Sequence, residues 1–326
     1  SPSAGPGAVK AARRAPVRVT LLVDNERGPK GLRSQWGFSA WVETERADVL
    51  LDCGCNDAFW RNARDLGVPL ERADAFVLSH GHYDHGGGIE RVRATAPDAR
   101  LVLHPAGLAP RYWLAKTRKV EPIGLPQRSV ETLEAAHERV TWALGPLQVA
   151  PGVWASGPVP RRHPLEEPER NFFLDRACTV RDHVIDDQAI WVETPRGLLV
   201  LVGCAHSGII NILDEVRRVA SGADAGRGPS ADRPERRPRA DALPPHRHDL
   251  PRAADGLPVV RAVIGGLHLL HASPARLRAT GDAFKAAEVA LAAPVHCTGK
   301  RGKDHLRATL GGAYADCATG SVLEFV

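Results

Sequence analysis

The sequence contains no methionine, few aromatic residues and no long apolar run. Aromatic side chains make up only 5% of the 326 residues. No segment approaches the ~18 consecutive apolar residues that a membrane-spanning helix requires, so the sequence predicts a soluble, cytoplasmic protein that does not bind a membrane. The chain opens at Ser1 without an apolar signal core, and whether a leader was removed before Ser1 stays open.

Support for disulfide pairing is also lacking. The six cysteines form no regular framework, and several of them stand beside glycines. This arrangement favours reduced thiols. Cys53 and Cys55 are separated by a single glycine, a spacing that favours ordinary packing over metal binding or redox chemistry.

The sequence has no excess of acidic residues, and its formal net charge is +5. Four positive charges lie near the start of the chain without an acidic neighbour, at Lys10, Arg13, Arg14 and Arg18. Residues 1–16 are rich in Gly, Pro, Ala and Arg, and they are expected to form a disordered, solvated tail. The chain shows no stripe of alternating basic and aromatic residues, so nucleic acid is not the expected partner.

A dense cluster of metal-binding residue types follows the apolar run 75–78, which predicts a buried strand. His80 and His82 leave an extended backbone on the same side, so both rings can bind one metal ion. Asp84 and His85 are adjacent and need a turn to converge, and the three glycines that follow provide a permissive backbone. Nitrogen and oxygen ligands suit zinc, iron or manganese. The cluster therefore predicts two neighbouring metals, and a His-rich surface loop is the less favoured alternative.

Strands and helices are predicted to alternate along the chain, which indicates a layered α/β domain. The hydrophobic content of 43% is ample for its core. Apolar and alternating runs predict strands at residues 17–23, 36–43, 48–51, 75–78, 101–104, 189–193, 197–202, 259–264 and 294–296. Helical spacing predicts helices at residues 56–66, 88–96, 209–216 and 274–291, and a last one that ends at Leu310. Ser207 is expected to cap the helix at 209–216.

Two long segments lack this regular patterning. Residues 105–182 contain many prolines and predict an irregular lid or substrate-recognition insert. Residues 221–257 are dense in Arg, Pro, Ala, Asp and Gly and predict a disordered loop. Five histidines in or next to these segments are not expected to bind metal: His137, His163, His183, His246 and His248.

The motifs of the chain resemble those of the metallo-β-lactamase fold. His-Gly-His-Tyr-Asp-His at 80–85 is similar to the signature of that fold. Other motifs are similar to the branch named for 7,8-dihydropterin-6-methyl-4-(β-D-ribofuranosyl)aminobenzene-5'-phosphate synthase. The resemblance runs from about Val17 to the C-terminus and implies one α/β domain at 17–326, an αββα sandwich of two mixed sheets flanked by helices. The branch motifs are Asp24-Asn25, Asp186-Asp187-Gln188-Ala189, Gly203-Cys204-Ala205-His206-Ser207-Gly208, Gly265-Gly266-Leu267-His268-Leu269 and His296-Cys297-Thr298-Gly299.

The resemblance also implies how the metals are held. His80, His82 and a third histidine would bind one ion, while Asp84, His85 and a last histidine would bind the other. His206 and His296 are the predicted third and last histidines. His268 competes for either place and is otherwise predicted to be catalytic together with Asp84.

Three further residues are expected near the metals. Asp52 stands where the fold has a carboxylate that orients a metal-bound histidine, with a helix or turn cap as the alternative. Cys204 stands where the fold usually has a bridging carboxylate, so such a bridge is in doubt. Asp187 is left as a carboxylate that approaches the metals from the side.

These residues predict a metal-dependent hydrolase or transferase that acts on a small phosphorylated or diphosphorylated substrate. The branch implies a relation to pterins, and the expected cofactors are two divalent ions, zinc first and iron or manganese as alternatives. An anion site is predicted at the start of the last helix, with a solvated basic turn as the alternative, from Thr298, Lys300, Arg301 and Lys303. The alternative function is a non-catalytic metal-binding or nucleic-acid-binding protein of the same fold. The exact substrate and the oligomeric state stay open.

Overall fold

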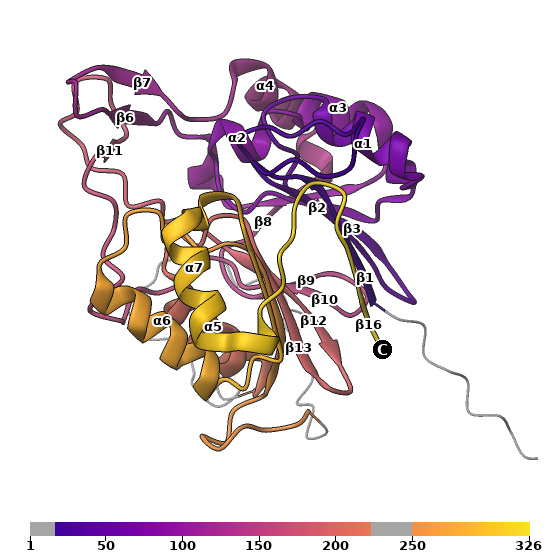
Figure 1. Ribbon diagram of the computed structural model, residues 1–326. Coiled ribbons are helices and arrows are strands. Elements are labelled where there is room, and N and C mark those ends of the chain that lie inside the picture. Colours follow the sequence, from indigo (N-terminus) through magenta and orange to yellow (C-terminus); the bar gives the residue numbers. More distant parts are fainter. Residues whose placement is uncertain (1–16, 223–249) are drawn as a thin grey trace, which may run out of the picture.

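Four layers, in the order helix, sheet, sheet and helix, make up the chain (Figure 1). The computed structural model describes residues 17–222 and 250–326. The predicted tail at 1–16 and residues 223–249 of the predicted loop, with His246 and His248, lie outside the described residues. Within the described part of the chain, no helix is both long and apolar enough to cross a membrane.

The first sheet has seven strands in the order β16-β1-β2-β3-β4-β5-β8. Antiparallel pairing joins β16, β1, β2 and β3, and parallel pairing joins β3, β4, β5 and β8. The carboxyl ends of the parallel strands therefore lie at one edge of the sheet. The strands are β1 (Val17–Val23), β2 (Ser39–Glu43), β3 (Asp48–Leu51), β4 (Ala75–Val77), β5 (Arg100–Leu103), β8 (Val140–Trp142) and β16 (Val322–Phe325).

The second sheet has six strands in the order β15-β14-β13-β12-β10-β9. β13, β14 and β15 run parallel to one another, while β9, β10 and β12 pair antiparallel. Both sheets are thus mixed, as predicted. The strands are β9 (Leu147–Ala150), β10 (Val153–Ala155), β12 (Ala189–Thr194), β13 (Gly197–Val202), β14 (Val260–Gly266) and β15 (Leu291–Val295).

Alternating side chains bury both faces of each sheet. In β13, Leu199 and Leu201 pack in the core between the two sheets. Leu198, Val200 and Val202 point to the opposite face, where they pack with the helices of the outer layer. Because both faces are buried, this strand is a continuous apolar run and not an alternating one.

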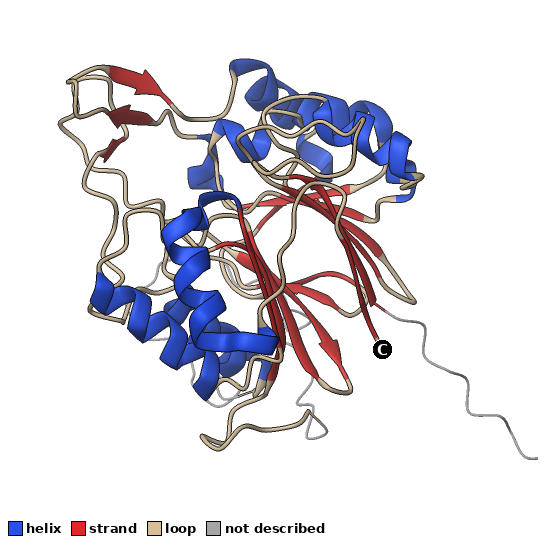
Figure 2. Cartoon of the chain, viewed as in Figure 1, coloured by secondary structure: helices blue, strands red, loops and turns tan. Residues whose placement is uncertain are grey.

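Helices cover the outer face of each sheet (Figure 2). Helices α1 (Ala58–Leu66), α3 (Ile89–Thr95) and α4 (Gln127–Ala135) pack on the first sheet, and α5 (Ile209–Ala220), α6 (Pro274–Ala286) and α7 (Gly299–Leu310) pack on the second. The predicted αββα sandwich is confirmed. The short helices are α2 (Tyr83–Gly86), η1 (Leu70–Arg72), η2 (Pro105–Leu108), η3 (His137–Arg139), η5 (His296–Thr298) and η6 (Gly311–Ala313).

The segment 105–182 is more regular than its sequence predicts. It supplies α4 and also β8, β9 and β10, which extend the two main sheets. Only β6 (Tyr112–Leu114), β7 (Val120–Pro122) and β11 (Phe172–Phe173) form a separate sheet, which projects from the body of the molecule (Figure 1). These strands are two or three residues long, too short for a sequence pattern to reveal.

The prediction that Ser207 caps α5 is wrong. The N-cap residue is Gly208, with a φ of 94°, and it makes no side-chain cap. The cap comes from the buried Glu166, whose carboxylate accepts hydrogen bonds from Ile210 N (3.0 Å) and Asn211 N (2.8 Å). The carboxylate of Glu166, which is distant in sequence, therefore caps α5 in place of the Ser207 hydroxyl.

Several predicted boundaries also differ from the structure. The helix predicted at 274–291 ends at Ala286, because Glu288 has a left-handed φ of 53° and Leu291 already begins β15. The predicted loop at 221–257 is packed at its end, where Leu250 and Ala253 are each 6% exposed.

Candidate metal centre

The candidate site lies where parallel strands of both sheets end. β4 leads to His80, and β13, β14 and β15 lead to His206, His268 and His296. Ligand sites of open α/β sheets form outside the carboxyl ends of strands. Three non-glycine residues at these ends have a left-handed φ, namely Ala205 (55°), His268 (48°) and His296 (50°). Such φ values cost free energy, so the surrounding structure must hold them in place.

His80, His82 and His206 form the first group of candidate metal ligands. One donor atom from each lies within 4.8 Å of the others. His80 Nε2 is 2.9 Å from His82 Nδ1, and His206 Nε2 is buried without a hydrogen-bond partner in the described part of the chain. Burial lowers the pKa of all three rings, so the imidazoles are neutral and keep a lone pair. Three neutral imidazoles can hold one zinc ion and leave a coordination position open.

Asp84, His85 and His296 form the second group. Their donor atoms also lie within 4.8 Å of one another. Asp84 Oδ2 is 3.6 Å from His85 Nε2 and 3.4 Å from His296 Nε2. Burial raises the pKa of the Asp84 carboxyl, but the neighbouring His85 and His296 outweigh it and hold that pKa well below its usual range. The group therefore offers two nitrogens and an ionised oxygen.

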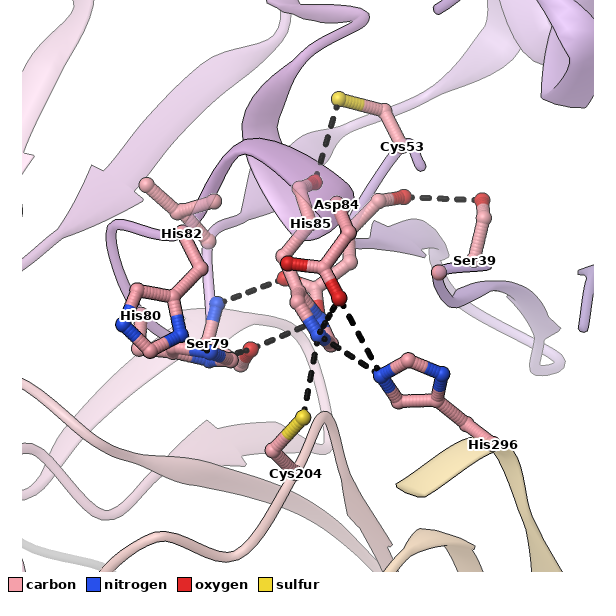
Figure 3. Close-up of polar contacts among 12 residues, drawn as sticks. Ser39, Cys53, Ser79, His80, His82, Asp84, His85, Cys204 and His296 are labelled. Atoms are coloured by element: carbon pink, nitrogen blue, oxygen red, sulfur yellow. Dashed lines mark hydrogen bonds and ion pairs between the residues drawn. The ribbon is translucent and has the colours of Figure 1, made fainter. Parts of the chain in front are cut away.

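Asp52 connects the two groups beneath the ligands. Its Oδ2 is 2.7 Å from His85 Nδ1 and accepts a 2.7 Å hydrogen bond from Ser79 Oγ. Ser79 Oγ in turn lies 2.9 Å from His80 Nδ1 (Figure 3). With its Nδ1 occupied, each ring presents Nε2 to the centre. Gly203 leaves room for this network, because a Cβ there would lie 2.1 Å from Ser79 Oγ.

His296 is oriented by residues that follow β1. Its Nδ1 lies 2.9 Å from Asn25 Oδ1, and its backbone N donates a 2.7 Å hydrogen bond to Asp24 Oδ1. The Asp24-Asn25 motif thus reaches His296 across 271 residues of sequence. The sequence offered this motif only as part of the family resemblance and did not assign it a role.

His268 lies beside the first group, and its ring centroid is 4.3 Å from that of His206. Its Nε2 is 2.9 Å from Glu169 Oε1. Cys204 lies between the groups, with its Sγ 3.1 Å from His85 Nε2. Glu169 had no signal in the sequence, because it belongs to the segment without regular patterning.

The Asp186-Asp187 pair supports the loops and is absent from every candidate ligand group of the described residues. Asp187 Oδ2 accepts a 2.8 Å hydrogen bond from Ser207 N, and burial raises the pKa of Asp187 to about 6. Asp186 Oδ2 accepts a 2.7 Å hydrogen bond from Gly81 N, and its Oδ1 accepts one from the buried Arg111. Asp187 Oδ2 therefore holds the loop after β13, while Asp187 Oδ1 is buried without a hydrogen-bond partner among the described residues. The approach of Asp187 to the metals from the side stays a prediction.

Comparison with known proteins agrees with this geometry. Residues 37–174 match the model of the metallo-beta-lactamase superfamily. A solved structure described as a metal-dependent hydrolase of the beta-lactamase superfamily is 26% identical, with a TM-score of 0.70 over 94% of this chain and 98% of that chain. The chain has the metallo-β-lactamase fold.

Two proteins of Methanocaldococcus jannaschii are similar to this metallo-β-lactamase-fold chain. An uncharacterized protein is 26% identical, and the match covers 86% of this chain and 90% of the relative. The 7,8-dihydropterin-6-methyl-4-(beta-D-ribofuranosyl)-aminobenzene-5'-phosphate synthase is 22% identical, with 95% and 97% covered. The predicted resemblance to the superfamily and to this branch is confirmed.

The predicted anion site of this metallo-β-lactamase-fold chain needs correction at two of its four residues. The Thr298 hydroxyl is buried, accepting a hydrogen bond from Leu267 N and donating one to Val295 O. Lys303 is 8% exposed and pairs with Glu26. The polar groups of both side chains are therefore occupied by contacts within the protein. The other two cations of the turn, Lys300 and Arg301, are exposed, and among the residues that the structure describes Lys300 pairs with the neighbouring Asp304 alone.

Two aromatic rings border the centre, and neither was predicted from the sequence to lie near the metals. Trp36 is 48% exposed, and its ring centroid lies 5.0 Å from that of His296. Phe172 on β11 contacts the rings of His82 and His206 edge-on, at 5.3 and 5.7 Å. The small sheet therefore covers the first group of ligands.

Proposed function

We propose that this chain is a hydrolase or transferase that acts on a small phosphorylated substrate through a dinuclear metal centre. The observation that carries the proposal is the convergence of two buried donor groups, one of three imidazoles and one of two imidazoles and a carboxylate. Asp52 contacts His85 directly and His80 through Ser79, so the groups share one support. Two adjacent groups of metal donors with open coordination positions are typical of catalytic metal sites and not of structural ones.

The donor set fits divalent zinc, iron or manganese. Bound ions of this kind polarise phosphoryl oxygens and lower the pKa of a bound water. The chain contributes the orientation of the ligands through Asp52 and Asn25, and an ionised carboxylate at Asp84. The contact of His268 Nε2 with Glu169 leaves Nδ1 as the ring nitrogen available at the edge of the centre.

The substrate class rests on two supports. The name of the synthase relative includes a 5'-phosphate group. In this chain, the exposed Lys300 and Arg301 follow His296 by only a few residues. Trp36 adds a half-exposed aromatic face beside His296 for the organic part of a substrate. The pair between Lys300 and Asp304 is exposed and contributes little to stability, so Lys300 can release it to bind an anion.

The metal assignment is tested first with His206→Ala. We expect the two groups of the dinuclear centre to hold two metal ions per chain in freshly purified protein, and the variant to bind metal there at least ~10-fold more weakly, because the first group loses one of three ligands. Elemental analysis after dialysis against buffered zinc, iron or manganese measures this. The matched control is His137→Ala, which removes an exposed imidazole outside the centre. Trace metal only in the wild type, with no uptake on addition, would overturn the proposal.

The substrate class is tested with a matched pair of substrates, one with a phosphate group and one without it. A screen of phosphoesters, diphosphates and lactones supplies the pair. We expect Lys300→Ala to raise the KM for the phosphate-bearing substrate more than it lowers kcat, because a cation that binds the phosphate acts on ground and transition states alike. Lys285→Ala at the end of α6 is the control. Equal wild-type activity on both substrates would return the substrate class to unknown.

A further inference from the structure

Two thiols and an imidazole converge at the ends of β13, β14 and β15. The Sγ atoms of Cys204 and Cys297 and one ring nitrogen of His268 lie within 4.8 Å of one another. Both cysteines are free and 4% exposed, and the His268 side chain is 21% exposed. None of the predicted ligand sets includes Cys297.

His268 has the arrangement of a metal-binding histidine. Its Nε2 is held 2.9 Å from the carboxylate of Glu169, and its Nδ1 is buried without a hydrogen-bond partner in the described residues. Ligating histidines commonly direct one nitrogen to a carboxylate and the other to the metal. The left-handed φ of 48° shows that the backbone accepts strain at this residue.

The packing around Cys297 leaves room for the thiol. A Cβ on Gly266 would lie 2.7 Å from Cys297 Sγ and 2.4 Å from Gly203 O, so only glycine fits there. Cys297 Sγ lies 3.5 Å from the carbonyl oxygen of Cys204, which brings the loops after β13 and β15 into contact. The three donors therefore come from three adjacent strands of one rigid sheet.

From this arrangement we infer that Cys204, His268 and Cys297 form a thiolate site for a soft divalent ion, separate from the two groups of nitrogen and oxygen donors. Thiolate sulfur and imidazole nitrogen select zinc, or its analogues cobalt and cadmium. Binding forms two metal–sulfur bonds and one metal–nitrogen bond, and it releases two thiol protons to solvent. Two thiolates on one tetrahedral zinc lie about 3.8 Å apart, so small side-chain movements suffice to close the site.

Cys204 also relates this site to the dinuclear centre, because its Sγ is 3.1 Å from His85 Nε2. Cys204 alone could therefore act as a ligand of the His85 group. Cys297 and His268 distinguish the proposed thiolate site from a role of Cys204 in the His85 group, because neither of these two residues belongs to a candidate group that contains His85. The test must separate the contributions of the two thiols.

The test is a titration of the metal-free, fully reduced chain with Co²⁺. Thiolate ligation produces a sulfur-to-cobalt charge-transfer absorption that nitrogen and oxygen ligands do not. We expect wild type to bind three equivalents and to show this absorption. Cys297→Ser should lose one equivalent of cobalt and, with it, the charge-transfer absorption. The control is Cys317→Ser, which changes a buried thiol elsewhere in the core and should leave both values unchanged.

A second variant keeps both thiols. Glu169→Gln should weaken cobalt binding at this site by about 10- to 100-fold, as loss of a carboxylate behind a ligating histidine does. Circular dichroism checks that each variant is folded. Absence of the charge-transfer absorption in wild type overturns the inference. It is also overturned if Cys204→Ser abolishes the absorption while Cys297→Ser and Glu169→Gln leave it intact, because Cys204 then acts alone. The charge-transfer absorption arises only from thiolate ligands, so its presence or absence does not depend on whether the nitrogen and oxygen groups of the proposed dinuclear centre bind metal.

Discussion

At the scale of single residues, Asp52 contributes most to the order of the candidate centre. It is fully buried, and its backbone has a left-handed φ of 56° directly after β3. Its Oδ1 accepts a 2.7 Å hydrogen bond from Ser79 N, and its Oδ2 serves Ser79 Oγ and His85 Nδ1. One carboxylate thus positions a ligand of each metal group.

Asp52→Asn should therefore weaken binding at both metal positions. The amide keeps the size of the side chain but replaces one accepting oxygen with a donor, so it cannot satisfy both Ser79 and His85. We expect metal affinity to fall by about 10- to 100-fold, with the fold retained. Competition with a chelator of known affinity measures the change. Asp65→Asn, at an exposed carboxylate of α1, is the matched control. Unchanged affinity in Asp52→Asn would show that Asp52 is only a structural cap.

At the scale of elements, α5 is held at both ends by residues outside it. Glu166 caps its first turn, as described above. Near its other end, Arg217 donates two hydrogen bonds to Asp255, of 2.8 and 2.7 Å, and one of 2.8 Å to Pro258 O. The Arg217 side chain is 4% exposed and that of Asp255 is 42% exposed. This contact anchors the chain that leads into β14.

Asp255→Asn tests this anchor through its dependence on pH. The hydrogen bonds from Arg217 lower the pKa of Asp255 below its ordinary value of 3.8. A carboxylate whose pKa is lowered by folding stabilises the protein above its unfolded pKa, and this stabilisation is lost as the pH falls through the folded pKa. We expect the variant to be about 1 kcal/mol less stable at pH 7, a value kept small by the exposure of Asp255.

Urea unfolding of the wild type and of Asp255→Asn at several pH values measures the difference. It should be constant between about pH 8 and pH 5 and shrink only below the ordinary pKa of a carboxyl group, near about 4. Asp282→Asn, at an exposed position of α6, serves as the control. A difference that disappears above pH 5, or that is absent at pH 7, contradicts the assigned contact.

At the scale of the whole molecule, three clusters of buried apolar side chains form the core of the described residues. One cluster fills the space between the sheets, and two others lie between a sheet and its helices. Leu250 belongs to the cluster around α5, and Ala253 is buried nearby. The chain just before β14 is therefore part of the packed structure.

We predict that replacing residues 223–249 with a short Gly/Ser linker leaves the free energy of unfolding within about 0.6 kcal/mol of the wild-type value, because closure entropy changes slowly with loop length. The composition of the segment, rich in charge and proline, predicts little apolar burial. Removing 221–257 should cost more, because it also removes Leu250 and Asp255. Urea unfolding of the two deletions measures this. Equal stability of both deletions, or loss of folded protein in the shorter one, would contradict the prediction.

Local patterns were sufficient to predict much of the fold. The helix predicted at 56–66 ends at Leu66 in the structure, where Gly67 follows with a left-handed φ of 70°. β13 was predicted over the same residues that it occupies, because an uninterrupted apolar run between a turn and a glycine is readable without its neighbours. The strands of 105–182 were missed because two to four residues carry no readable periodicity, and because their pairing is with strands distant in the chain, either in the main sheets or in the small separate sheet.

By itself, the sequence determined a layered α/β domain and the cluster at 80–85, because alternation of apolar positions and the spacing of ligands are local properties of the chain. The αββα arrangement was implied by the family resemblance of its motifs. Only the tertiary structure decided the partners that are distant in sequence. It brings Asp52 to His85, Asn25 to His296 and Glu169 to His268. These contacts depend on which strand ends meet at one edge of the two sheets. No short segment of the sequence predicts which strand ends meet, because the pairing of strands is set by the packing of the whole core.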